Sequence, residues 1–192
     1  MNTWVCIAGG PSLREKDIGY CRRKGWKLAT CNLSFRVVPD ALVYLATDTR
    51  FWREYGEEVQ RTMRPDCELW TGDHWASVSF KIRRFVNQGE GAWPTAPGNA
   101  CWGALSGFKL VHLVGCRDPR PTRIILLGYD HMHTGGKFHH HDDYPKGWTN
   151  AHNMDSHTHR YEAMAKESPV EIVNASRETA LECFERVRLE DL

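Results

Sequence analysis

A short apolar run near the start of the chain, Val5 to Ala8, breaks off into four turn-forming residues, Gly9, Gly10, Pro11 and Ser12. An apolar run of this length bounded by glycines is typical of a strand buried on both faces, as in a parallel sheet. Glycine tolerates positive φ and has no side chain, so backbone N–H groups after such a strand can approach a phosphate, and Ser12 could add a hydroxyl donor or cap a helix. The pattern matches neither the dinucleotide fingerprint nor the P-loop, and a tight turn without a ligand is the common alternative.

The rest of the chain alternates apolar runs with helical segments. Five further runs predict strands, at residues 27–31, 41–46, 68–71, 123–127 and 170–173. Apolar residues at helical spacing predict helices over 48–64 and 99–114, and the second helix leads into "TRIILLGYD", which makes half of a β-α-β unit. We therefore expect an α/β fold with a Rossmann-like open, mainly parallel sheet and helices on both faces. The segment 75–97 mixes apolar residues with glycines and prolines and is expected to be an ordered loop.

The composition limits the class of protein. With 192 residues and 41% hydrophobic content, the chain suits one domain over 1–192. A formal net charge of +1 favours a small-molecule partner, with a nucleic acid still possible as an acceptor. The seven cysteines are scattered without a CxxC pair, as reduced core thiols are. No stretch reaches the roughly 18 apolar residues of a membrane helix, so we expect a soluble, cytoplasmic protein, monomeric or homo-oligomeric.

Ligands of open α/β sheets bind beyond the carboxyl ends of the parallel strands. Asn32 directly follows the second predicted strand and could hold a ribose or a base edge, while Asp48 follows the third and could accept from a ribose hydroxyl or hold a metal ion. Both have structural alternatives, Asn32 as a turn former and Asp48 as a helix N-cap. Gly98 and Asn99 open the second predicted helix, so we expect their N–H groups to point into the same crevice as the first turn.

Histidines crowd one region, since eight of the ten lie between His131 and His159. One hypothesis is a metal site built from imidazole and carboxylate ligands, although the spacing matches no compact zinc pattern. A second is phosphate recognition and acid–base chemistry, because imidazole titrates near neutral pH and the segment follows a strand that should end at the crevice. A third is a solvated polar loop. The candidate phosphate or metal ligands are His133, His139, His141, Asp142 and Tyr144.

One further acidic residue, Asp130 in "LLGYD", comes just after a predicted buried strand. A carboxylate at such a place is costly unless it is paired or has a function. The alternative is a loop aspartate that hydrogen-bonds its own backbone. We favour a functional role for Asp130.

Four segments together resemble a known family: "AGGPSL", "LATCNLSFRVVPDALVYLATD", "GNACWGALSGFKLVHLVG" and "RIILLGYD". They resemble the bacterial sialyltransferases of glycosyltransferase family 42, the archaeal 6-hydroxymethylpterin diphosphokinases and, most nearly, small phage and prophage proteins related to both. The likeness implies a Rossmann-like fold that binds a nucleotide at the first turn and at the start of the central helix. It also implies a base histidine between "RIILLGYD" and the last helix, where His152 and His157 lie, and a location in the host cytoplasm if the chain is phage-encoded.

Three hypotheses for function follow. The first is a nucleotide-dependent, glycosyltransferase-like transferase that uses a nucleotide or nucleotide-sugar donor and an acceptor hydroxyl, with His152, His157 and Asp130 as catalytic residues. The second is an ATP-dependent diphosphokinase in which Asp48, Asp130 or Asp142 holds Mg²⁺. The third is a non-catalytic phage protein that sequesters a nucleotide. We favour the first.

Overall fold

The computed structural model describes residues 2–103, 105–141, 144–145, 148 and 154–192. Within these ranges lies an eight-stranded sheet in the order β10-β9-β8-β1-β2-β3-β4-β5, and its strand pairs are parallel. Its strands are β1 (Thr3–Ile7), β2 (Lys27–Cys31), β3 (Val43–Leu45), β4 (Glu68–Thr71), β5 (Arg83–Arg84), β8 (Arg123–Leu127), β9 (Glu171–Asn174) and β10 (Glu185–Arg186). The predicted parallel sheet is confirmed.

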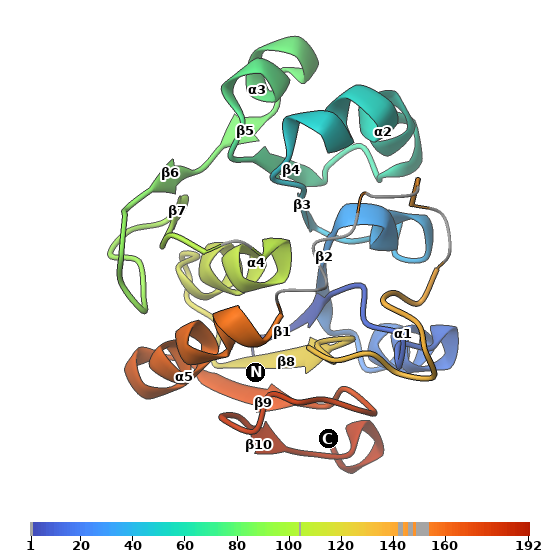
Figure 1. The fold of residues 1–192 in the computed structure, drawn as a ribbon, viewed down its shortest axis with the longest axis vertical. Coiled ribbons are helices and arrows are strands. Elements are labelled where there is room, and N and C mark those ends of the chain that lie inside the picture. The colour runs from blue at the N-terminus through green and yellow to red at the C-terminus, as the bar shows by residue number, and fades with distance from the viewer. Residues whose placement is uncertain (1, 104, 142–143, 146–147, 149–153) are drawn as a thin grey trace.

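Helices cover both faces of the sheet, with α1 and α2 on one side and α4 and α5 on the other (Figure 1). The helical elements are α1 (Glu15–Arg23), η1 (Asn32–Arg36), α2 (Thr49–Thr62), α3 (His74–Phe80), α4 (Ser106–Gly115), η3 (Asp155–His157), α5 (Thr158–Glu167) and η4 (Leu189–Asp191). None of the helices in the described part of the chain combines the length and the apolar composition that crossing a bilayer requires.

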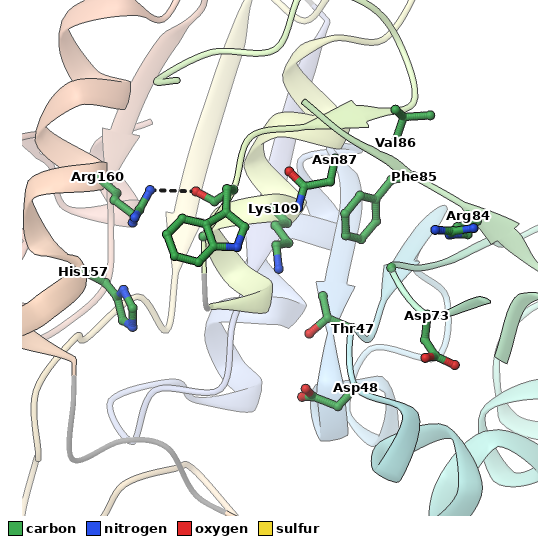
Figure 2. A pocket seen from close by; sticks show the side chains of 13 residues that line it. Thr47, Asp48, Asp73, Arg84, Phe85, Val86, Asn87, Lys109, His157 and Arg160 are labelled. Carbon is green, nitrogen blue, oxygen red and sulfur yellow. Dashed lines mark hydrogen bonds between the residues drawn. The ribbon is translucent and has the colours of Figure 1, made fainter. Parts of the chain in front are cut away.

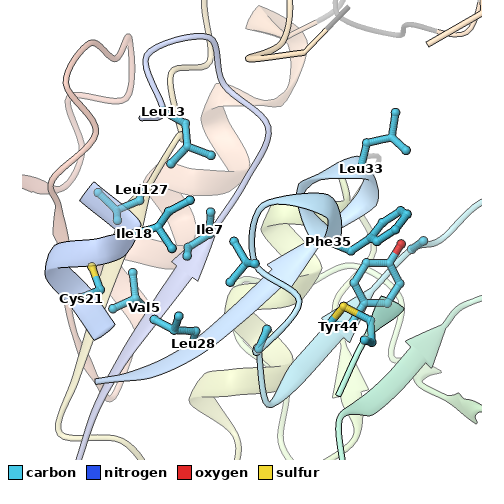
Figure 3. Packing of buried hydrophobic residues seen from close by; sticks show 14 of the residues in the cluster. Val5, Ile7, Leu13, Ile18, Cys21, Leu28, Leu33, Phe35, Tyr44 and Leu127 are labelled. Carbon is cyan, nitrogen blue, oxygen red and sulfur yellow. The ribbon is translucent and has the colours of Figure 1, made fainter. Parts of the chain in front are cut away.

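Successive residues of the central strand β1 serve opposite layers of the core, as the alternation of side chains along a strand requires. Val5 and Ile7 pack with Ile18 of α1 in one cluster, which Figure 3 shows. Trp4 and Cys6 belong to the other cluster, with the apolar face of α4. All five residues of β1 are buried, which explains why its sequence reads as an uninterrupted apolar run.

The prediction of a helix over 99–114 is wrong at its start, because α4 begins only at Ser106. Asn99 and Ala100 form strand β7 (Asn99–Ala100), which pairs with β6 (Val86–Asn87) in a second, two-stranded sheet. The next N–H groups also have partners outside a helix, since Cys101 donates to the His112 ring at 3.3 Å and Trp102 to a loop carbonyl at 2.7 Å. Backbone donors bound in this way cannot join the helical ladder.

The prediction of an ordered loop over 75–97 is also only partly right. Helix α3 and the short strands β5 and β6 fall within or overlap this segment. Asp73 caps α3 by accepting from the Ala76 N–H at 2.8 Å, and Lys81 ends it in the left-handed conformation with φ of 54°. A helix of seven residues is too short for a clear apolar period, which is why the spacing did not indicate it.

Candidate functional site

Strands β1 and β8 pair side by side although the chain visits β2 to β5 between them. This reversal of strand order is the place where open α/β sheets bind ligands. A pocket of about 130 Å³, here called the glycine pocket, lies at their carboxyl ends. Its wall includes the predicted residues Gly9, Gly10, Pro11, Asn32, Asp130, His139, His141 and Tyr144. The structure thus brings the opening turn and part of the histidine-rich segment together.

The opening turn is occupied by a carboxylate of the protein itself. The N–H and the hydroxyl of Ser12 both donate to the carboxylate of Asp130, each at 2.6 Å. Burial raises the pKa of Asp130, and the hydrogen bonds from Ser12 oppose that rise. A Cβ at Gly10 would lie 2.3 Å from an Asp130 oxygen and 2.5 Å from the Gly128 carbonyl. Internal packing therefore requires the glycine at position 10, and Ser12 keeps no donor for a phosphate.

The histidine-rich segment adds aromatic rings to the glycine pocket. His139 and His141 stack with ring centres 5.2 Å apart, and Tyr144 meets both rings edge-on. Burial lowers the pKa of His139, while a hydrogen bond to the backbone of Gly9 opposes this shift. His133 is exposed, with its ring against Phe138. The buried part of the segment therefore favours neutral imidazole over a cationic phosphate site.

A second hollow of about 820 Å³, here called the wide cleft, opens at the carboxyl ends of β3 and β4. Figure 2 shows its ionisable lining residues, which are Asp48, Asp73, Arg84, Lys109, His157 and Arg160. Small-molecule sites usually measure about 300–1,000 Å³. The wide cleft has the size for a nucleotide-sized ligand, whereas the glycine pocket is smaller than this range.

The amino end of α4 lies at the boundary between the two hollows. Ser106 and Gly107 line the glycine pocket, and the Ser106 hydroxyl lies 3.2 Å from the hydroxyl of Thr47, which lines the wide cleft. Lys109, one turn further along α4, points toward Thr47 and Asp48 (Figure 2). Burial lowers the pKa of Lys109, and the charge of Asp48 opposes that shift. The positive end of a helix dipole and an ammonium group together favour an anion at this boundary.

Two aspartates occupy equivalent places in the wide cleft but differ in their contacts. Asp48 is the N-cap residue of α2 and Asp73 that of α3, with nearly the same backbone angles, φ/ψ of −91°/133° and −89°/131°. Asp73 accepts from the Ala76 N–H at 2.8 Å and from the Thr49 hydroxyl at 2.5 Å. The alternative that Asp48 is a helix N-cap is therefore confirmed by position, but its exposed side chain makes no cap hydrogen bond.

The start of α5 forms the facing wall of the wide cleft. Burial lowers the pKa of His157, and the charges of Arg160 and His159 lower it further, so the imidazole is neutral at pH 7. Its Nδ1 is buried and has no hydrogen-bond partner among the described residues. Arg160 donates to the Trp102 carbonyl at 2.9 Å, the dashed line in Figure 2, and its guanidinium carbon lies 4.7 Å from the centre of the Trp102 ring.

The remaining predicted site residues have other positions. The prediction that Gly98 and Asn99 open the central helix is wrong, since Gly98 has a φ of 76° and lies against Trp70 while Asn99 begins β7. His152 and Asp142 lie outside the described residues, so their roles stay predictions. In the described part of the chain, no group of three or more His, Cys, Asp or Glu side chains could hold a metal ion, and a Mg²⁺ site also stays a prediction.

Lys109, Trp102 and Arg160 were not predicted as site residues. Lys109 had a signal, because it is the one charged residue in the apolar α4 sequence SGFKLVHLVG. An uncompensated charge in a buried helix is costly unless it has a partner or a function. The sequence carries no local signal for Trp102 and Arg160, because their contact joins residues 58 positions apart.

No known family profile matches the chain, and no curated protein matches it in sequence. The fold is similar to that of the MAf glycosyltransferase from Magnetospirillum magneticum AMB-1, with a TM-score of 0.69 at 13% sequence identity. The likeness covers 100% of this chain and 34% of the other, so the chain spans about a third of its neighbour's length. At this identity the comparison establishes the fold class, a Rossmann-like α/β sheet that a glycosyltransferase also has. The finer likeness to sialyltransferases, diphosphokinases and phage proteins stays a prediction.

Proposed function

We propose that the chain is a nucleotide-dependent, glycosyltransferase-like transferase that moves a group from a nucleotide-activated donor to an acceptor hydroxyl. The wide cleft carries the proposal, because an ammonium group and a neutral imidazole line one hollow at the carboxyl edge of the sheet, and the start of α4 lies at its boundary. The fold shared with a glycosyltransferase supports the transferase class. A cleft of about 820 Å³ has room for a nucleotide-activated donor.

The donor phosphates bind at the boundary between the two hollows in this proposal. The first N–H groups of α4, which lack carbonyl partners within the helix as all helix starts do, the hydroxyl of Thr47 and the ammonium group of Lys109 lie there. Deep in the glycine pocket the carboxylate of Asp130 would repel an anion. We therefore propose a phosphate site beside the start of α4, and not at the opening turn where the sequence predicted it.

In the transfer step, the acceptor oxygen bonds to the reacting atom of the donated group while the bond from that atom to the donor phosphate oxygen breaks. His157 takes the acceptor's proton, a role that its neutral imidazole permits at pH 7. The electron pair of the broken bond stays on the phosphate oxygen. Lys109 and the dipole of α4 stabilise the negative charge that develops there.

Replacement of Lys109 by methionine tests the proposal. We expect Lys109→Met to lower kcat/KM for nucleotide release from a panel of UDP-, GDP- and CMP-sugars by about 100- to 1,000-fold, as loss of one transition-state charge contact does. Lys16→Met, an exposed lysine on α1, is the matched control and should keep the wild-type rate. Equal rates for Lys109→Met and wild type would contradict the proposal.

Addition of ATP to this panel, with Mg²⁺ or with EDTA, separates the transferase from a diphosphokinase. A diphosphokinase would consume ATP only with Mg²⁺, because metal ions neutralise the charge on the transferred phosphoryl group. The transferase should release nucleotide from a sugar donor in the presence of EDTA. Turnover of ATP alone, abolished by EDTA, would replace the present proposal by the diphosphokinase.

A further inference from the structure

Trp102 leaves its large ring unusually open for a tryptophan in a concave wall. Its side chain is 52% exposed and lines the wide cleft. Tryptophan is highly buried on average, because its ring is the largest apolar side-chain surface. The exposure is not a result of a loose position, since Arg160 both binds the Trp102 carbonyl at 2.9 Å and lies 4.7 Å from the ring centre.

Arg160 therefore covers one part of the indole and leaves the rest facing the hollow. The guanidinium group is flat, and a cation above an indole ring is an attractive arrangement. A ring that is fixed in this way loses little side-chain entropy when a ligand covers its open surface. The position is thus preorganised for a flat ligand.

The charges around Trp102 indicate which flat ligand fits. Lys109 lines the same cleft as Trp102, and the start of α4 lies at its boundary, so both favour the phosphates of a ligand there, as the proposed function requires. The glycine pocket, at about 130 Å³, is too small for a nucleoside, whereas the wide cleft of about 820 Å³ can hold the phosphates and a heterocycle together.

We propose that Trp102 is the stacking platform for the nucleobase of the donor, so that the base lies in the wide cleft and not in the glycine pocket. This inference rests on the proposed function for the presence of a nucleotide. Every base has a flat π-face that can stack on an aromatic ring, so Trp102 contributes to nucleotide affinity with little specificity for one base. Larger purine rings should cover more of the indole than pyrimidines.

The experiment compares ligands with and without a base. Binding of ADP, GDP, UDP and CDP, and of inorganic pyrophosphate, is measured by calorimetry on the wild type, Trp102→Ala and Trp102→Phe. We expect Trp102→Ala to weaken the nucleoside diphosphates by about 10- to 100-fold and to change the pyrophosphate affinity by less than about twofold. Trp102→Phe, which keeps an aromatic face, should weaken the nucleoside diphosphates by about threefold or less.

The chain supplies a matched control. Trp75 on α3 is 40% exposed, and the Arg53 guanidinium carbon lies 5.0 Å from its ring centre, but it does not line the wide cleft. Trp75→Ala should bind every probe like the wild type. Binding of the base should also quench tryptophan fluorescence in the wild type, and Trp102→Phe should lose that quenching.

Each outcome decides a different claim. Nucleoside diphosphate affinity that is unchanged in Trp102→Ala, or quenching that persists in Trp102→Phe, would overturn the platform and leave the proposed function standing. An equal loss for pyrophosphate and nucleotides would also overturn it, because Trp102 would then act only through Arg160. Failure of all five probes to bind the wild type would overturn the platform, and nucleotide release from the sugar-donor panel would then decide the proposed function separately.

Discussion

The two hollows at the carboxyl edge differ in how their polar groups are used. In the glycine pocket these groups are bound by neighbouring residues, since Asp130 accepts from Ser12 and the Ser34 hydroxyl lies 3.1 Å from the His140 ring. In the wide cleft Lys109 and Asp48 face the hollow instead. A glycine-rich turn after a buried strand indicates that another group approaches its backbone closely. Here that group is the carboxylate of Asp130, which accepts the hydrogen bonds that a ligand would otherwise accept.

The largest expected effect concerns the wall of the wide cleft. His112 of α4 accepts from the Cys101 N–H and contacts the Ala92 carbonyl at 3.0 Å, which holds the loop that leads to Trp102. Burial lowers the pKa of His112 to about 4 from its usual 6.5. In the unfolded chain His112 is therefore protonated below pH 6.5, whereas in the folded chain it is protonated only below about pH 4. The contribution of His112 to the free energy of unfolding is greatest above pH 6.5. It falls as the pH is lowered toward 4, by about 3 kcal/mol in total.

Urea unfolding at pH 7.5 and pH 4.5 measures this effect. His112→Gln should be less stable than the wild type at pH 7.5, because the contacts of the ring are lost, but should lose less stability on acidification. His74→Gln, an exposed histidine on α3, controls for the substitution itself and should follow the wild type. The same acid loss in His112→Gln and wild type would show that the cleft wall does not depend on a neutral His112.

The second prediction concerns the glycine pocket and compares two neighbouring glycines. A Cβ at Gly10 would lie 2.3 Å from Asp130, whereas one at Gly9 would lie an ordinary 3.5 Å from His139. We expect Gly10→Ala to lower the free energy of unfolding by about 2 kcal/mol, as overpacking of a rigid site does, and Gly9→Ala to change it by less than about 0.5 kcal/mol. Equal stabilities in urea would mean that the turn moves easily away from Asp130.

The smallest expected effect separates the two aspartates of the wide cleft. Asp73→Ala should lower the free energy of unfolding by about 1 kcal/mol, because it removes the cap of α3. Asp48→Ala should change it by less than about 0.5 kcal/mol, since this carboxylate caps nothing. Thermal unfolding of both variants gives the comparison, and a larger loss for Asp48→Ala would show that Asp48 supports the fold instead of facing a ligand.

The sequence predicted the layers of the fold better than the site. Buried parallel strands read directly as apolar runs, so β2 and β8 were predicted where they lie, and β1 was predicted two residues late at its start. The start of α4 was predicted wrongly, because the N–H groups of residues before it bind partners that come near only when the chain is folded. The contact of Ser12 with Asp130 joins residues 118 positions apart and leaves no local pattern.

His157, the N-cap residue of helix α5, and Arg160 within the helix line the wide cleft, and Tyr161 of the same helix lines the glycine pocket. One rigid helix therefore borders both hollows. A ligand that displaces α5 from one side alters the affinity of the other, and thermodynamic reciprocity makes the two effects equal in size.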